Sequence, residues 1–139
     1  AHGLTYSGHP VAAAAGLATL DILCEQDTIA RAARSLAPLL QERLRELADH
    51  PIVGEVRGHG LFAAVELVRD KGSRERLAPD AAAAVFCRNS ANELGLMVRQ
   101  TGDAMIMAPP LVCEPGEIED LVRMLAQALD VTGRHYGVA

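Results

Sequence analysis

The fold is decided by one stretch near the middle of the chain, Ile52-Val-Gly-Glu-Val-Arg-Gly-His-Gly-Leu-Phe-Ala-Ala-Val-Glu-Leu-Val68. Its two apolar parts, residues 52–57 and 61–68, have the length and composition of strands. Gly58-His59-Gly60 separates them, and two glycines in three residues permit a tight connection. The stretch therefore predicts a β-hairpin.

Helical segments lie on both sides of this hairpin. They are expected at residues 11–23, 27–50, 81–94 and 115–130, and two further short strands are expected at 96–99 and 104–107. Helices and strands are thus mixed without a regular βαβ alternation. We expect an α+β fold, in which helices pack on a small, mainly antiparallel sheet.

Local signals indicate where the helices begin, bend and end. Pro10 fits the first turn of the first helix, which is apolar on nearly all faces and is expected to be buried. Asp27 and Asp80 are candidate N-caps, and Gly95 is a candidate C-terminal stop. Pro38 falls inside the second helix, so we expect a kink there.

The composition is that of a folded protein. Of 139 residues, 50% are hydrophobic and 22% are charged. The net charge of -5 argues against a nucleic-acid or anionic-membrane partner, and no apolar run approaches the roughly 18 residues of a membrane span. Three widely spaced cysteines form no CxxC pair and indicate buried thiols in a reducing compartment. We therefore expect a cytoplasmic location.

Lys71 is the only lysine of the chain. Its neighbours Asp70 and Arg74-Glu75-Arg76 form a solvated charge cluster, whereas a catalytic lysine is normally desolvated. Lys71 is therefore a poor catalytic candidate. The histidines show no metal-ligand spacing, and no phosphate-binding loop or nucleophile motif is present, so no metal site is expected.

The first segment that could carry chemistry precedes the first helix. Thr5 and Ser7 supply hydroxyl groups, and Gly8 follows them. Free N–H groups at a helix start attract anions, and hydroxyl groups can donate to phosphate oxygens. The alternative is an ordinary helix start capped by Ser7 or Thr5.

The second segment contains Arg99 at a predicted strand end, beside the glycine turn at residues 100–103. A guanidinium group can bind a substrate carboxylate through two parallel hydrogen bonds, and a loop base would let it move. The alternative is an exposed ion pair between Arg99 and Asp103.

The third segment is the predicted hairpin turn. His59 could act as an acid or base there, but a turn explains the glycines without any chemistry. Glu66 lies in an apolar strand, where an edge or half-exposed position is favoured over a buried acid.

Together these segments resemble the C-terminal part of class III pyridoxal-phosphate aminotransferases, the ω-transaminase group. The resemblance is carried by Gly3-Leu-Thr-Tyr-Ser-Gly-His-Pro10, by Val56-Arg-Gly-His-Gly-Leu61 leading to Glu66-Leu67, by Val98-Arg-Gln-Thr-Gly-Asp103, and by Ala108-Pro-Pro-Leu111. Their order and spacing agree over nearly the whole chain.

The resemblance implies a fold type I architecture and a role for two short sites. Residues 1–26 would end the large cofactor-binding domain and form the connecting helix, and residues 27–139 would form the small C-terminal domain. Thr5 would donate to the phosphate of pyridoxal 5′-phosphate in a neighbouring subunit, with Leu4 beside it. Arg99 would pair with the keto-acid carboxylate and swing aside for an amine. The Schiff-base lysine would lie upstream, so this chain would hold no catalytic residue.

The function implied is transfer of an amino group from an amine or ω-amino acid to a keto acid such as pyruvate. The complete enzyme would be a homodimer or higher oligomer, and the chain alone would be inactive. One alternative is a related aminomutase or decarboxylating transaminase. Another is a non-catalytic accessory or interaction domain derived from such an enzyme.

Overall fold

The computed structural model describes residue 3 and residues 5–138. The helices are α1 (Pro10–Glu25), α2 (Thr28–Arg31), α3 (Ala37–Glu46), α4 (Ala82–Glu93) and α5 (Pro115–Tyr136). The strands are β1 (Val53–His59), β2 (Phe62–Leu67), β3 (Arg99–Thr101) and β4 (Ala104–Met107). A π-helical segment, η1 (Ala32–Leu36), joins α2 to α3, and 3₁₀ turns form η2 (Leu47–Asp49) and η3 (Pro79–Ala81).

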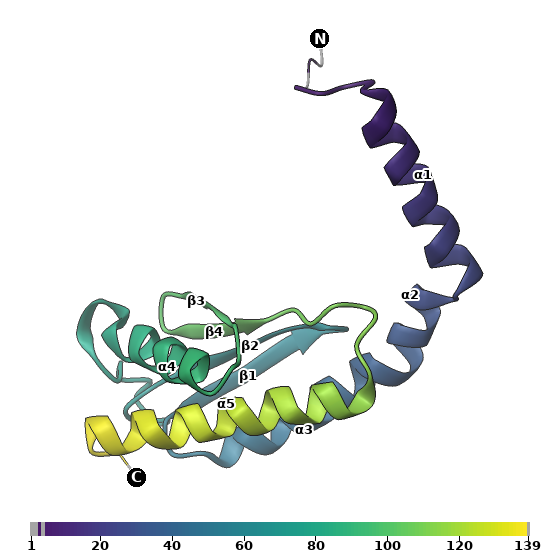
Figure 1. The fold of residues 1–139 in the computed structure, drawn as a ribbon. Helices are drawn as coiled ribbons and strands as arrows, with labels where there is room; N and C mark the ends of the chain where they lie inside the picture. Colours follow the sequence, from purple (N-terminus) through teal and green to yellow (C-terminus); the bar gives the residue numbers. More distant parts are fainter. Residues whose placement is uncertain (1–2, 4, 139) are drawn as a thin grey trace.

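The four strands form one antiparallel sheet in the order β1-β2-β4-β3. Helices α3, α4 and α5 cover one face of this sheet (Figure 1). Their buried side chains meet those of the strands in a core of small and aliphatic residues with two methionines; it includes Leu36, Leu40, Leu44, Val65, Cys87, Met105, Met107, Ile118, Leu125 and Leu129. The predicted α+β fold is confirmed.

The predicted hairpin is present, with a shorter loop than expected. Strand β1 continues through Gly58 and His59, so the loop is the pair Gly60-Leu61. Gly60 has a φ of 60°, as the first loop position of a tight two-residue hairpin requires. Gly58 serves a different purpose, because a Cβ atom there would lie 2.5 Å from the carbonyl oxygen of Phe62.

Where a kink is expected at Pro38, the structure has a π-helical segment directly before the proline. The amide of Ala37 donates to the carbonyl of Ala32, five residues back, at the end of η1. Proline offers no N–H, and its ring would clash with the carbonyl four residues earlier. The widened π turn relieves that clash, so the helix continues into α3 with Pro38 in its first turn.

Helix α1 is exposed over nearly its whole length, contrary to the expected burial, and only Leu23 near its end is half-buried. It projects away from the sheet and the other helices (Figure 1), and none of its residues is buried. The prediction of burial was wrong for this chain, because no other described residue packs along the apolar surface of α1. Cys24 is exposed with it, whereas Cys87 is buried and Cys113 is half-buried.

Asp27 occupies the N-cap position of α2, as predicted, whereas the prediction was wrong for Asp80, which lies inside η3 while Ala81 directly precedes α4. Both aspartates have left-handed backbones, with φ values of 48° and 52°. Neither side chain caps a helix; Asp27 instead lies 2.5 Å from a guanidinium nitrogen of Arg34. Gly95 ends α4 with a φ of 91°, as predicted. The last helix begins at the expected Pro115 and runs six residues further than expected, to Tyr136.

Candidate functional site

Arg99 is the first residue of β3 and pairs with Ile106 of β4. The sequence predicts a strand at residues 96–99 and a turn at residues 100–103. The loop is instead the pair Gly102-Asp103, because Gly102 adopts a φ of 57° and lets the ladder extend to Thr101. Arg99 therefore lies at a strand end, as predicted, but it belongs to the sheet, and the expectation of a loop base was wrong. Its freedom lies in the side chain.

The register of the sheet places Arg99 in one row with Ile106, Ala64 and Arg57. This row lies on the face of the sheet opposite the helices. Arg57 is neutralised there by two carboxylates, at 2.5 Å from Glu66 and 3.4 Å from Glu55. Arg99 is exposed, and none of the described carboxylates lies within ion-pair distance of it. It is thus the arginine of the strands that is free to bind an anion.

The alternative role for Arg99, a surface pair with Asp103, is wrong. Asp103 accepts a hydrogen bond from Nε of Arg76 at 2.6 Å, and its side chain is only 17% exposed. The hairpin turns back between Arg99 and Asp103, so the aspartate contacts the loop that follows β2. Sequence analysis missed Arg76 because its partner is 27 positions away.

Thr5 lies in a turn that runs to Gly8, directly before α1. We had considered Ser7 or Thr5 as the cap of this helix. The cap is instead His9, whose Nδ1 accepts from the amide of Ala12 at 3.4 Å. The exposed Thr5 hydroxyl is therefore not used as a helix cap. Leu4, the other predicted cofactor contact, lies outside the described residues.

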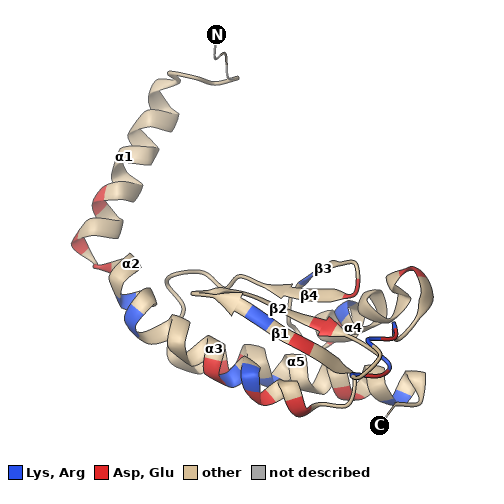
Figure 2. Cartoon of the chain, turned by 180° about the vertical axis from the view of Figure 1, so that it is seen from behind, with Lys and Arg blue, Asp and Glu red and all other residues tan. Residues whose placement is uncertain are grey.

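The electrostatics of this turn suit a phosphate group. The first turn of α1 contains no acidic residue, and the beginning of this helix is drawn entirely in the colour of uncharged residues in Figure 2. The positive end of the helix dipole is therefore not cancelled locally. A threonine hydroxyl and a helix start are donors of the kind that hold phosphate oxygens, so these residues fit the phosphate of the expected cofactor.

Within one chain, Thr5 and Arg99 do not meet. Thr5 precedes the projecting helix α1, whereas Arg99 lies on the sheet, well away from that end of the helix (Figure 1). The two candidate residues thus lie in separate parts of the structure.

The surroundings of His59, Glu66 and Lys71, the other residues considered for chemistry, do not indicate a catalytic role. His59 is the exposed last residue of β1. Glu66 is half-buried and paired with Arg57, as the half-exposed alternative predicted. Lys71 donates to the carbonyl of Ala48 at 2.7 Å on the surface. In the described part of the chain, no cluster of three metal-binding side chains is found, and no helix could cross a membrane.

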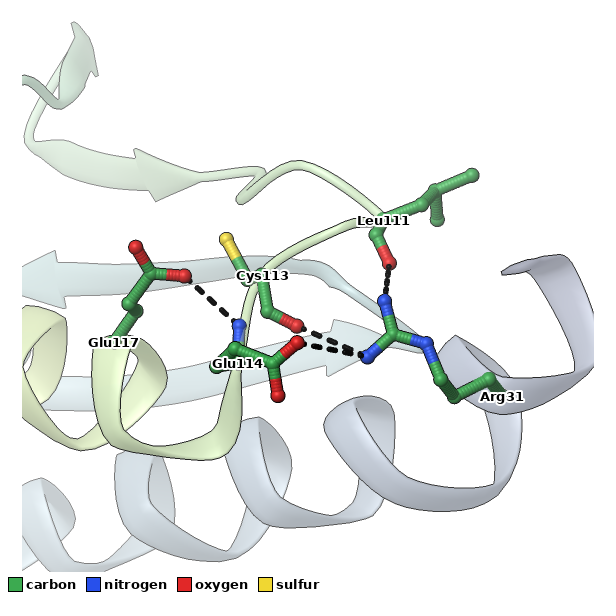
Figure 3. A network of polar contacts seen from close by, with 5 residues as sticks. All are labelled: Arg31, Leu111, Cys113, Glu114 and Glu117. Carbon is green, nitrogen blue, oxygen red and sulfur yellow. Dashed lines mark hydrogen bonds and ion pairs between the residues drawn. The ribbon is translucent and has the colours of Figure 1, made fainter. Parts of the chain in front are cut away.

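A polar network that was not predicted from the sequence joins α2 to the loop before α5 (Figure 3). Arg31 donates to the carbonyls of Leu111 and Cys113 at 3.3 and 3.4 Å, and lies 3.6 Å from the carboxylate of Glu114. Burial, followed by the charge of Glu117, raises the pKa of the Cys113 thiol. The network fixes the base from which α1 projects.

The described residues thus include an exposed arginine on a four-stranded antiparallel sheet and an exposed threonine hydroxyl just before a projecting helix. The profile of one family, described as aminotransferase class-III, matches residues 1–129. The chain belongs to this family, as the resemblance of its motifs predicted.

Individual relatives agree with this assignment. The chain is 48% identical over 131 residues to the putrescine–pyruvate aminotransferase of Pseudomonas aeruginosa. The aligned residues cover 94% of the chain and 28% of that protein. It is 37% identical over 131 residues to the mitochondrial gamma aminobutyrate transaminase 1 of Solanum lycopersicum, with 94% and 25% covered. The omega transaminase from Pseudomonas jessenii in complex with PMP superposes with a TM-score of 0.93 at 40% identity, with 99% and 30% covered. The chain thus spans less than a third of the length of these relatives.

Proposed function

We propose that the chain is the C-terminal part of a pyridoxal-phosphate-dependent transaminase, which moves an amino group from an amine or ω-amino acid to a keto acid such as pyruvate. The observation that carries the proposal is Arg99, which stands on the uncovered face of the sheet while Arg57 in the same row is neutralised. Family membership supplies the reaction class.

Arg99 binds the carboxylate of the keto acid. Its planar guanidinium can donate two parallel hydrogen bonds to a carboxylate, a geometry that lysine cannot reproduce. Because the strand fixes the backbone, the long side chain alone moves aside when the amine substrate has no carboxylate. One residue thereby serves substrates with and without negative charge.

Thr5 holds the phosphate of the cofactor, with the amide groups around the start of α1 and with Leu4 beside it. When bound, pyridoxal 5′-phosphate supplies the electron sink for transamination. The Schiff-base lysine belongs to another part of the enzyme, since Lys71 is exposed and engaged with Ala48. We therefore expect this chain alone to be inactive.

Further features belong to the same proposal. The boundary between the large and small domains is placed at residues 26 and 27, where Asp27 breaks the helix. The enzyme is a homodimer or higher oligomer, so that Thr5 of one subunit serves the cofactor of its neighbour. Three free cysteines favour the cytoplasm.

The alternative of a free-standing accessory domain is disfavoured by α1. Val11, Leu17 and Leu20 are 70%, 64% and 59% exposed in this chain. A contiguous apolar surface of this kind is rarely left in water. It is the expected state of a segment that packs against the remainder of an enzyme.

The test replaces Arg99 in the complete enzyme that carries these residues. Arg99→Ala should raise the KM for pyruvate by roughly 30- to 100-fold, which corresponds to about 2–3 kcal/mol for a lost charge-assisted pair. The KM for a plain amine donor should change little. Arg123→Ala, which removes an exposed arginine of α5, is the control. Equal losses for both substrates would reject the role of Arg99.

A further inference from the structure

The strand that carries Arg99 is short and lies at the edge of the sheet. It has three residues, and β4 is its strand neighbour. Strand β4 is fixed by its pairing with β2, whereas β3 is joined to β4 through three residue pairs, and so short an edge strand contributes few ladder hydrogen bonds. The position of Arg99 therefore depends on what else holds the β3–β4 hairpin.

Three contacts hold the tip of this hairpin. The carbonyl of Asp103 accepts from the amide of Leu67 at 2.9 Å, which joins the tip to the end of β2. The side-chain amide of Gln100 donates to the carbonyl of Gly102 at 2.6 Å. The Asp103 carboxylate accepts from Nε of Arg76 at 2.6 Å. Arg76 is the one side chain among these contacts that comes from outside the hairpin.

The loop that presents Arg76 is itself well braced. The Asp70 carboxylate accepts from the amide and the hydroxyl of Ser73 at 2.7 and 2.8 Å, and these bonds lower the pKa of Asp70. The amide of Arg69 donates to the carbonyl of Glu75 at 2.7 Å. Arg76 thus extends from a loop that these hydrogen bonds hold in place. Its hydrogen bond to Asp103 raises the pKa of the Arg76 guanidinium group.

We infer that Arg76 and Asp103 are positioning residues for the keto-acid carboxylate: their ion pair fixes the β3–β4 hairpin and thereby the place from which Arg99 reaches the substrate. This inference rests on the proposed role of Arg99. Neither residue needs to touch the substrate. Breaking the pair lets the three-residue strand shift, and a small displacement weakens a bidentate contact disproportionately.

The test compares acceptors with and without a carboxylate in the complete enzyme. Arg76→Gln and Asp103→Asn should each raise the KM for pyruvate about tenfold, while kcat and the KM for a neutral aldehyde acceptor change less than twofold. The double variant should be no worse than either single variant, because both remove the same pair. Arg123→Gln is the matched control: its side chain is 59% exposed against 57% for Arg76, and it also pairs with a carboxylate.

A second measurement follows the hairpin directly. Amide hydrogen exchange in a peptide covering residues 96–107 should be faster in Arg76→Gln than in the parent enzyme, and unchanged in Arg123→Gln. Equal losses for pyruvate and the aldehyde, or no loss for either, would overturn the inference. If Arg99→Ala leaves the KM for pyruvate unchanged, the proposed function itself fails. If Arg99→Ala raises it and Arg76→Gln does not, only the positioning role fails.

Discussion

Gly58 lies opposite Ala63 in the central hairpin, and it offers a quantitative test of the fold. A Cβ atom there would lie 2.5 Å from the carbonyl oxygen of Phe62 and 2.8 Å from Cα of Ala63. Both neighbours are backbone atoms, so no side-chain rotation relieves the contact. To restore ordinary van der Waals separation, β1 and β2 would have to move apart locally by about 1 Å.

The cost of Gly58→Ala follows from that displacement. Forcing an extra carbon into a packed site costs about 1–3 kcal/mol, and a weakened ladder hydrogen bond adds about 1 kcal/mol. The reduced entropy of the unfolded chain returns about 0.4–1 kcal/mol. The net loss in the free energy of unfolding should be about 2–3 kcal/mol. In urea this corresponds to a midpoint lowered by roughly 1 M or more, for slopes of about 1–3 kcal/mol/M.

Urea unfolding of the 139-residue chain, followed by far-ultraviolet circular dichroism, measures this loss. Gly60→Ala is the first control: its Cβ atom meets open space but has to adopt a φ of 60°, so it should cost about 1–2 kcal/mol. Gly16→Ala in α1 meets neither obstacle and should not destabilise the chain. A loss below about 0.5 kcal/mol for Gly58→Ala would refute the close-approach argument.

Three further predictions concern single side chains. His59→Gln should leave both the activity of the complete enzyme and the urea midpoint unchanged, because His59 is exposed at a strand end; a large loss of kcat would restore a catalytic role. Cys87 should resist iodoacetamide in the native chain while the exposed Cys24 reacts, since burial raises the pKa of the Cys87 thiol to about 11; mass spectrometry of the labelled peptides decides this. The raised pKa of Cys87 also adds to the free energy of unfolding. This contribution is fully present below about pH 9 and is lost as the pH rises towards 11, because the Cys87 thiol of the unfolded chain loses its proton at a lower pH than that of the folded chain. Glu117→Ala should cost about 1 kcal/mol, because it removes the carboxylate that accepts from the amide of Glu114 at 2.8 Å at the start of α5; an unchanged thermal midpoint would contradict it.

The sequence was most informative where signals are local. Pro38 marked the irregular helix, Gly95 marked a helix end, and the glycines at positions 58 and 60 marked the hairpin. Each of these residues acts on its own backbone or on its immediate neighbours. Their effects could therefore be predicted without knowledge of the rest of the fold.

It was least informative where the outcome depends on distant partners. Asp80 is of a residue type that is favoured at N-caps, but the backbone of residues 80 and 81, which lead into α4, is left-handed. Asp103 is four positions from Arg99, yet its partner is Arg76. The sequence located the candidate substrate arginine through its family motif, but not the residues that hold it in place.

The joint between α1 and α2 has a mechanical consequence for Thr5. Helix α1 has 16 residues and is therefore a rod about 24 Å long. A swing of only about 1° at Asp27 would displace the far end of the rod by roughly 0.5 Å, which spans the usual range of hydrogen-bond lengths. The Asp27–Arg34 pair and the contacts of Arg31 stiffen the pivot, but leverage of this kind demands support along the rod as well. The position of the Thr5 hydroxyl, proposed above to hold the cofactor phosphate, would thus depend on the contacts that support α1 in the complete enzyme.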